Sequence, residues 1–184
     1  MALSPRELER YDRQIRISEW RIEGQKKLKK AKVVVAGIGG LGGLAALYLA
    51  AAGVGKLILV DKGRFELSNL NRQILGWEKD VGRLKVQAAK EKLEALNPEI
   101  EIETVTEEIT EANIDSIIKN AHAIIDGMDN WKTRFILNKA CVLNNIPFVH
   151  AGVSEFHGQI TTIMPGEGPC LRCILPRNPP EKEK

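Results

Sequence analysis

Five short segments of this chain carry residue types that suit a highly charged ligand. In chain order they are the glycine-rich run 37–42, Asp61, the polar run 69–73, Lys85 and the acidic run 126–130. Glycines that follow a strand let the backbone approach a phosphate, and the N-terminus of the next helix supplies N–H donors and partial positive charge. Arginine, lysine and aspartate beside such a turn suggest a nucleoside triphosphate that travels with a metal ion.

The glycine run follows the pattern of a dinucleotide-binding turn. Gly37, Gly39 and Gly42 have the G-x-G-x-x-G spacing, and Asp61 comes nineteen residues after the last glycine. A carboxylate at that distance is expected at the end of the second strand, where it accepts hydrogen bonds from ribose hydroxyls. A tight strand-to-helix turn that binds no ligand is the alternative.

Two basic residues favour a triphosphate over a dinucleotide. A pyrophosphate group carries about two negative charges, whereas ATP carries about four and its chemistry depends on Arg, Lys and Mg²⁺. Lys85 falls in the first turn of an expected helix, an unfavourable place for a cation unless an anion binds there. Otherwise Lys85 is a solvated surface lysine, and Arg72 is an arginine at the rim of a packed loop.

Asp129 offers a ligand for the metal ion that accompanies ATP. It follows an expected strand end by three residues and precedes an expected helix. If it faces the phosphate site, its carboxylate can bind Mg²⁺ through oxygen. Its alternative role is the N-cap of the helix that follows.

The order of these motifs resembles the ThiF/MoeB/HesA group, relatives of the ubiquitin-activating enzymes. The resemblance extends from Tyr11 to Cys173 and is carried by RQI, GIGGLG, SNLNRQ, DGMDN and CLRC together with Asp61 and Lys85. It implies an adenylyltransferase that binds ATP and the C-terminal Gly-Gly tail of a small ubiquitin-like sulfur carrier. Such an enzyme forms an acyl-adenylate with loss of pyrophosphate and serves cofactor synthesis (molybdopterin or thiamine) or tRNA sulfur chemistry.

The resemblance also assigns roles to individual residues. Those expected to line the ATP site, with Asp129 on Mg²⁺, are Gly40, Asp61, Asn69, Arg72, Lys85 and Asp129. Their neighbours complete the expected cofactor-binding set: Gly37, Gly39, Gly42, Asn71, Gln73 and Asn130. Arg13 would reach the phosphates in the neighbouring subunit of a homodimer, although its position beside Tyr11 alone indicates a surface charge. The catalytic set is therefore Arg13, Arg72, Lys85 and Asp129. No side-chain nucleophile is needed, because the carrier's carboxylate attacks the α-phosphorus.

Cys170 and Cys173 form one Cys-x-x-Cys pair, which resembles half of a structural zinc site. A tetrahedral zinc site needs two more thiolates or imidazoles, and family members that bear zinc supply them from a second such pair further along the chain. With the sequence ending at Lys184, three readings stay open: a missing downstream segment, a site completed by a partner chain, or no metal. Cys141 is expected in the core. The histidines are expected to be structural, with His150 nearest the cleft.

Alternating strands and helices are expected to bring the five segments together. Apolar or alternating runs predict strands at 32–36, 57–60, 100–105, 123–126, 148–150 and 158–164. Helices are expected from about residue 5 and at 19–30, 43–52, 83–96, 114–119 and 131–144, with a long functional loop at 62–80. Short connections between them predict a Rossmann-like α/β fold: a doubly wound, mostly parallel sheet with helices on both faces. Ligands of such sheets bind beyond the carboxyl ends of the strands.

Length and composition describe one mildly basic globular domain. The net charge of +3 over 184 residues is too small to predict DNA binding. No run reaches the ~20 apolar residues of a membrane helix, no signal-peptide pattern is present, and three cysteines fit a reducing cytoplasm. We expect an N-terminal helical segment at 1–30 that contributes to a dimer, an adenylation domain at 31–175 and a polar, mobile tail at 176–184.

Three other functions share part of this pattern. A family relative could activate an acid on modified tRNA and dehydrate it to a cyclic form with the same ATP residues. A nicotinamide-dependent oxidoreductase would share the glycines and Asp61, but it has no need of Arg72, Lys85 and Asp129. A non-catalytic module that binds a nucleotide or a protein is the third.

Overall fold

Strands and helices alternate along most of the chain, and the computed structural model describes residues 2–177 and 179. The strands are β1 (Lys32–Ala36), β2 (Lys56–Val60), β3 (Glu101–Val105), β4 (Ala123–Asp126), β5 (Phe148–Ser154) and β6 (His157–Ile163). The helices are α1 (Pro5–Arg10), α2 (Asp12–Ile15), α3 (Arg21–Lys30), α4 (Gly40–Ala52), α5 (Lys85–Leu96), α6 (Ile114–Ile118), α7 (Trp131–Leu143) and α8 (Leu171–Ile174). Two 3₁₀ turns, Leu67–Asn69 and Glu78–Asp80, shape the long loop between β2 and α5.

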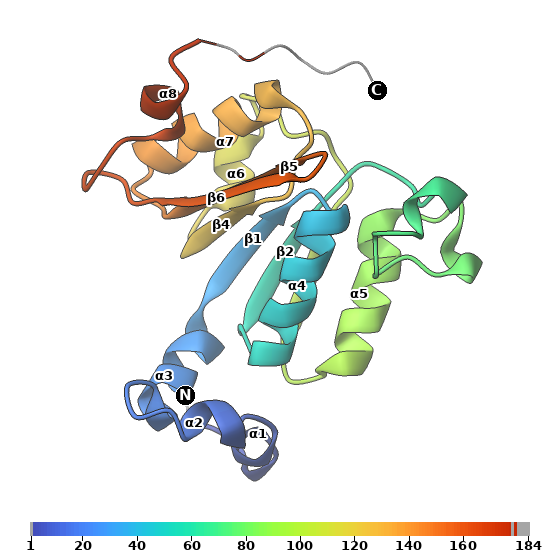
Figure 1. The fold of residues 1–184 in the computed structure, drawn as a ribbon. Helices are drawn as coiled ribbons and strands as arrows, with labels where there is room; N and C mark the ends of the chain where they lie inside the picture. The colour runs from blue at the N-terminus through green and yellow to red at the C-terminus, as the bar shows by residue number, and fades with distance from the viewer. Residues whose placement is uncertain (1, 178, 180–184) are drawn as a thin grey trace.

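The strands form one six-stranded sheet in the order β3-β2-β1-β4-β5-β6. Neighbouring strands are parallel from β3 to β5, and β6 runs antiparallel to β5. The chain therefore builds the sheet outward from β1 in one direction and then from β4 in the other (Figure 1). This topology confirms the expected Rossmann-like, doubly wound sheet, and the reversal between β1 and β4 is where such sheets bind ligands.

Helices cover both faces of the sheet because each central strand is apolar on both sides. Along β1, Val33 and Val35 pack into a core cluster with α4 and α5, whereas Val34 and Ala36 pack into a second cluster with α6 and α7. This alternation follows from the two-residue repeat of a strand. A run of β-branched residues such as that of β1 is typical of a strand buried on both faces.

The N-terminal helices pack at the end of the sheet where the strands begin (Figure 1). Helix α1 starts with a capping box, in which Ser4 Oγ accepts the Glu7 N–H at 3.2 Å and the Glu7 carboxylate accepts the Ser4 N–H at 2.7 Å. Tyr11, 3% exposed, accepts a hydrogen bond from Asn97 Nδ2 at 2.8 Å, just after α5. The segment is thus fixed to the domain at the end opposite the carboxyl ends of the strands.

Several element boundaries differ from those expected. Helix α4 begins at Gly40 rather than Gly43, because the last two glycines of the run lie inside the helix. Strand β5 continues to Ser154, since pairing with β6 extends it through Gly152, which reads as a loop residue in the sequence. The sequence indicated two N-terminal helices where the structure has three, and it did not indicate α8.

Within the part of the chain that the structure describes, no helix has the length and apolarity needed to cross a bilayer. The tail expected to be mobile, 176–184, lies largely outside the described residues.

Candidate active site

A cavity of about 1150 Å³ lies over the carboxyl ends of β1, β2, β4 and β5. All five segments singled out in the sequence contribute to its lining, although they are separated by up to 93 residues along the chain (from Gly37 to Asn130). The expected site residues that line it are Gly37, Gly39, Gly40, Asp61, Arg72, Gln73, Lys85, Asp129 and Asn130. The topology of the sheet therefore gathers most of the expected set at one place.

Four of the expected residues lie elsewhere. Asn69 is buried within the long loop, where its Oδ1 accepts the Glu66 N–H at 3.2 Å. Asn71 Oδ1 accepts a hydrogen bond from Arg72 Nη1 at 3.0 Å, so Asn71 supports the arginine rather than facing the cavity. The Arg13 side chain is 87% exposed on α2 and does not line the cavity of its own chain. The fourth expected residue outside the cavity lining is Gly42, which packs inside the glycine turn.

The glycine run forms a tight turn from β1 into α4. Gly37 has φ of +86°, a backbone conformation that favours glycine. A Cβ at Gly42 would lie 1.8 Å from the Gly37 carbonyl oxygen, so this glycine permits close packing inside the turn. Gly39 is the N-cap of α4 and provides no side-chain acceptor, which leaves the first N–H groups of a 13-residue helix at the cavity. Such groups bind phosphate oxygens.

Asp61 is held at the end of β2 by two backbone donors. Its Oδ2 accepts the Ile38 N–H at 2.8 Å and its Oδ1 accepts the Gly63 N–H at 2.7 Å. The carboxylate thus joins the glycine turn to the loop that follows β2. Because a carboxylate has about four lone-pair positions, it retains acceptor capacity for the hydroxyls of a ribose.

The two basic residues enter the cavity from the long loop and the start of α5. Arg72 Nη1 also donates to the Ser68 carbonyl at 3.0 Å, which holds the guanidinium group beside its own loop. Lys85 is the first residue of α5, and its backbone N–H donates to the Gly63 carbonyl at 3.0 Å. A Cβ at Gly63 would lie 3.6 Å from Lys85 Cε, so the lysine side chain runs alongside the loop that Asp61 anchors.

Asp80 fixes the loop that carries Arg72 to the helix that carries Lys85. Its side chain is fully buried, accepts the Trp77 N–H at 3.0 Å and Arg83 Nη1 at 2.8 Å, and pairs with Lys92 of α5. Burial would raise the pKa of this carboxyl, but its ion pairs and hydrogen bonds outweigh burial, so the pKa lies below the ordinary value of 3.8.

The N-cap of α7 is Asn130 and not Asp129. The Asn130 side chain accepts the Thr133 N–H at 2.9 Å, so the capping role considered for Asp129 in the sequence belongs to its neighbour. Asp129 is exposed where it lines the cavity. No three metal-binding side chains of the described residues form a cluster, so a magnesium ion here would take most of its oxygen ligands from phosphate and water, as it commonly does.

A buried polar group lies beneath the other end of the cavity; the sequence placed Asp126 and His150 at strand ends near the cleft but did not predict that they pair. Asp126 and His150 are register partners on β4 and β5, and Asp126 Oδ2 lies 2.6 Å from His150 Nδ1. Arg134 Nε lies 3.5 Å from the same oxygen, while its Nη2 donates to the Met128 and Ala151 carbonyls. Gln159 on β6 lies 3.2 Å from His150 Nε2. Pairing the two expected parallel strands would have placed Asp126 beside His150. The positions of Arg134 and Gln159 next to this pair could not be predicted from the sequence and are known from the structure.

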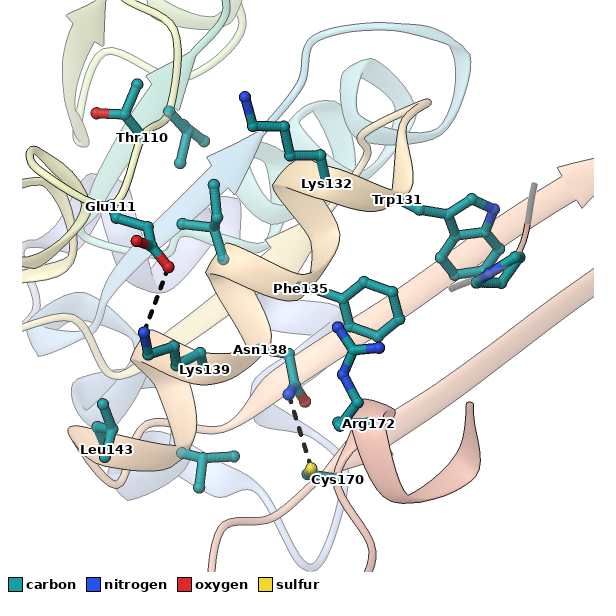
Figure 2. Close-up of a pocket in the computed structure, with 14 residues that line it drawn as sticks. Thr110, Glu111, Trp131, Lys132, Phe135, Asn138, Lys139, Leu143, Cys170 and Arg172 are labelled. Atoms are coloured by element: carbon teal, nitrogen blue, oxygen red, sulfur yellow. Dashed lines mark hydrogen bonds and ion pairs between the residues drawn. The ribbon is translucent and has the colours of Figure 1, made fainter. Parts of the chain in front are cut away.

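A second cavity, of about 820 Å³, follows the outer side of α7 (Figure 2). It is mostly apolar and includes Phe135, over which the Arg172 guanidinium group lies at 3.5 Å. Cys170 lines it as well and accepts a hydrogen bond from Asn138 Nδ2 at 3.6 Å.

The two cysteines expected as half of a zinc site face each other at the start of α8. Their sulfur atoms lie 3.7 Å apart, close to the ~3.8 Å edge of a tetrahedron with Zn–S bonds of ~2.3 Å. Burial would raise the pKa of the Cys170 thiol, but hydrogen bonds from backbone N–H groups, Asn138 and Cys173 lower it. Cys141 is buried, as expected, and burial raises the pKa of its thiol to about 12.

Comparison with known proteins identifies the family. The model of the ThiF family matches residues 11–184. The chain belongs to the ThiF family. This confirms the resemblance seen in the sequence, since the match includes every segment that lines the cavity.

Relatives within the ThiF family have longer chains. The heterocyst HesA protein of Trichormus variabilis is 48% identical over 177 residues, which cover 96% of this chain and 66% of that protein. The adenylyltransferase and sulfurtransferase MOCS3 of Anopheles gambiae is 45% identical over 174 residues, covering 95% of this chain and 40% of that protein. The crystal structure of E. coli MccB with ATP superposes with a TM-score of 0.80 at 31% identity, covering 89% of this chain and 51% of that one. The chain thus spans between two-fifths and two-thirds of the length of these proteins.

Proposed function

We propose that this ThiF-family domain binds ATP with Mg²⁺ and adenylates the C-terminal carboxylate of a small ubiquitin-like sulfur-carrier protein, releasing pyrophosphate. The observation that supports this most is the convergence of Arg72, Lys85 and Asp129 with the glycine turn on one cavity. Relatives named as an adenylyltransferase (MOCS3) and solved with ATP (MccB) support the same class of reaction.

The cavity lining fits a nucleotide in two respects. Gln73 is 6% exposed and its Oε1 has no hydrogen-bond partner among the described residues. This oxygen can accept a hydrogen bond from an amino or hydroxyl group of a ligand. A Cβ at Gly40 would come no closer than 3.6 Å to the Arg72 backbone. Because Gly40 has no side chain, the N-terminus of α4 leaves room for a phosphate beside Arg72.

In the proposed reaction the carrier's carboxylate oxygen attacks the α-phosphorus of ATP. The new bond joins that oxygen to phosphorus, the bond from the α-phosphorus to the bridging oxygen breaks, and pyrophosphate leaves with the electron pair. Arg72 and Lys85 stabilise the charge that develops on the departing pyrophosphate, and the N–H groups at the start of α4 orient the phosphates. Mg²⁺ held by Asp129 would neutralise further charge on the phosphate oxygens.

Two parts of the proposal depend on residues beyond this cavity. Arg13, exposed on α2, would act on the phosphates of a second subunit in a homodimer. Cys170 and Cys173 would bind zinc with two further ligands from outside the described residues. The identity of the carrier belongs to the proposal as well.

The test is ATP–pyrophosphate exchange by the full-length protein in the presence of candidate carriers. We expect exchange that depends on a carrier and that falls to background in Asp129→Ala, while Asp115→Ala, an exposed carboxylate on α6, retains it. A thermal-shift comparison addresses the oxidoreductase alternative: stabilisation by NAD but not by Mg-ATP would contradict our proposal.

A further inference from the structure

The cavity has a second end that the nucleotide-binding segments do not reach. Asp61 follows β2, whereas Gln159 lies on β6, four strands away in the sheet order. At ~4.8 Å between neighbouring strands, the two ends are about 19 Å apart. A ribose bound by Asp61 and phosphates bound at the glycine turn therefore leave the β5–β6 end for the acyl substrate.

The Gln159 side chain packs over Gly152 at this end. Gly152 and Gln159 are register partners on β5 and β6. A Cβ at Gly152 would lie 3.4 Å from Gln159 Nε2 and 3.6 Å from Arg134 Nη1, which is ordinary contact. The glutamine side chain thus lies over the β5 backbone, with its amide nitrogen 3.2 Å from His150 Nε2.

The Asp126 carboxylate determines which ring nitrogen of His150 faces it with a hydrogen. The groups around the Asp126 carboxylate are donors: the Met128 N–H reaches Oδ1 at 2.9 Å, and Arg134 Nε lies 3.5 Å from Oδ2. An acceptor-only carboxylate requires that His150 Nδ1, at 2.6 Å, carries the hydrogen. In the neutral ring Nε2 is then an acceptor.

An acceptor at His150 Nε2 fixes the orientation of the Gln159 amide. Only the NH₂ group of the glutamine can donate to Nε2, and the distance of 3.2 Å is measured to its nitrogen. One N–H of the amide is used by His150, whereas the amide oxygen has no partner among the contacts of this network. Since Gln159 lines the cavity, that oxygen can accept a hydrogen bond from a ligand at this end.

We propose that Gln159 is a specificity-determining residue, whose amide oxygen accepts the last peptide N–H of the acyl substrate, and that His150 and Asp126 position it. This rests on the proposed adenylation and adds that the substrate is recognised as a peptide amide. A carboxylic acid with an ester oxygen in place of that N–H would meet an unpaired acceptor and bind more weakly.

Two stable mimics of the acyl-adenylate test this by calorimetry. One is N-acetylglycyl-sulfamoyladenosine, which has the N–H, and the other is its acetoxyacetyl analogue, in which an ester oxygen replaces it. We expect the protein to bind the amide about tenfold more tightly, as one hydrogen bond predicts. Gln159→Met should reduce the ratio to about one, whereas Gln87→Met, an exposed glutamine on α5 outside the cavity, should leave it unchanged.

Binding of ATP, measured in parallel, separates the two levels of the proposal. If ATP binds but the mimics bind equally well or not at all, the assignment of Gln159 is wrong and nucleotide binding stands. If neither ATP nor the mimics bind, the proposed function fails and the assignment with it. ¹⁵N NMR of labelled histidine tests the positioning role directly: a His150 protonated at Nε2 would overturn it.

Discussion

Asp126 and His150 stand opposite each other on adjacent parallel strands, with Oδ2 and Nδ1 2.6 Å apart and both side chains almost fully buried. The pair lies beneath the β5–β6 end of the cavity, whereas Asp61, after β2, lies at the opposite end. The carboxyl ends of the strands thus place polar side chains at both ends of a single cleft.

Lys85→Ala should lower the turnover number for carrier-dependent exchange about 10²-fold, because a cation at the start of α5 stabilises charge on the leaving pyrophosphate. The measurement is steady-state exchange with saturating ATP. Lys90→Ala on the same helix, where the side chain pairs with Glu94 at 3.6 Å, provides the control. Equal rates for the two variants would remove Lys85 from the catalytic set.

The glycines at positions 40 and 42 should respond differently to alanine. At Gly42 the new Cβ would lie 1.8 Å from a backbone oxygen, so we expect the free energy of unfolding to fall by about 3 kcal/mol. At Gly40 the nearest atom is 3.6 Å away, so the fold should remain while ATP binds about tenfold more weakly, because the methyl group occupies phosphate space. Urea unfolding and ATP titration measure the two effects, and similar unfolding free energies would contradict the packing role of Gly42.

Asp80→Asn should destabilise the fold by about 3 kcal/mol near neutral pH, because it removes one partner of a buried ion pair. The folded-state pKa of Asp80 lies below 3.8, so its contribution to stability is present above that pH and is lost as the pH falls through the lowered pKa. Unfolding free energies of the two proteins should therefore converge below pH 3.8. A difference that stays constant down to pH 2 would exclude this ionisation as the cause.

Cys170→Ser in the full-length protein should reduce bound zinc from one ion per chain to much less than one, as measured by metal analysis after dialysis. The reason is that a tetrahedral thiolate site tolerates the loss of a ligand poorly. Cys141→Ala, which changes a thiol in the core, should keep its zinc. Zinc that is absent from the wild-type protein, or equal in both variants, would reject Cys170 as a ligand.

Subunit mixing tests whether Arg13 acts across a dimer. Arg13→Ala and Asp129→Ala proteins should each be inactive, and a one-to-one mixture should recover up to about a quarter of the wild-type rate, since mixed dimers contain one intact site. Native mass spectrometry establishes that the subunits exchange. Exchange without recovered activity would mean that Arg13 acts within its own chain or has no catalytic role.

The sequence predicts the sheet well because the central strands are buried on both faces. The β-branched run from Lys32 to Ala36 is typical of such a strand, and the glycine run after it predicts the turn into the next helix. The sequence also placed Lys85 in the first turn of a helix expected at 83–96, and the structure makes it the first residue of α5.

What the sequence does not reveal depends on register and on single-residue boundaries. The β5–β6 hairpin relies on pairing between Gly152 and Gln159, which neither residue indicates alone. Capping by Asn130 instead of Asp129 is a shift of one residue, smaller than the accuracy with which a pattern locates a helix end. Gly42 fits the phosphate-binding pattern, but in the fold it serves the packing of the turn.

Three glycines join the loops beneath the cleft through their backbones. A Cβ at Gly127 would lie 2.7 Å from the Gly37 carbonyl oxygen and 2.8 Å from Gly42 Cα, so the turns after β1 and β4 touch without any side chain between them. Contacts of this kind cannot slide or repack as side chains do. The part of the cleft floor that these turns form should therefore change little in conformation when a ligand binds, so that little conformational entropy is lost there.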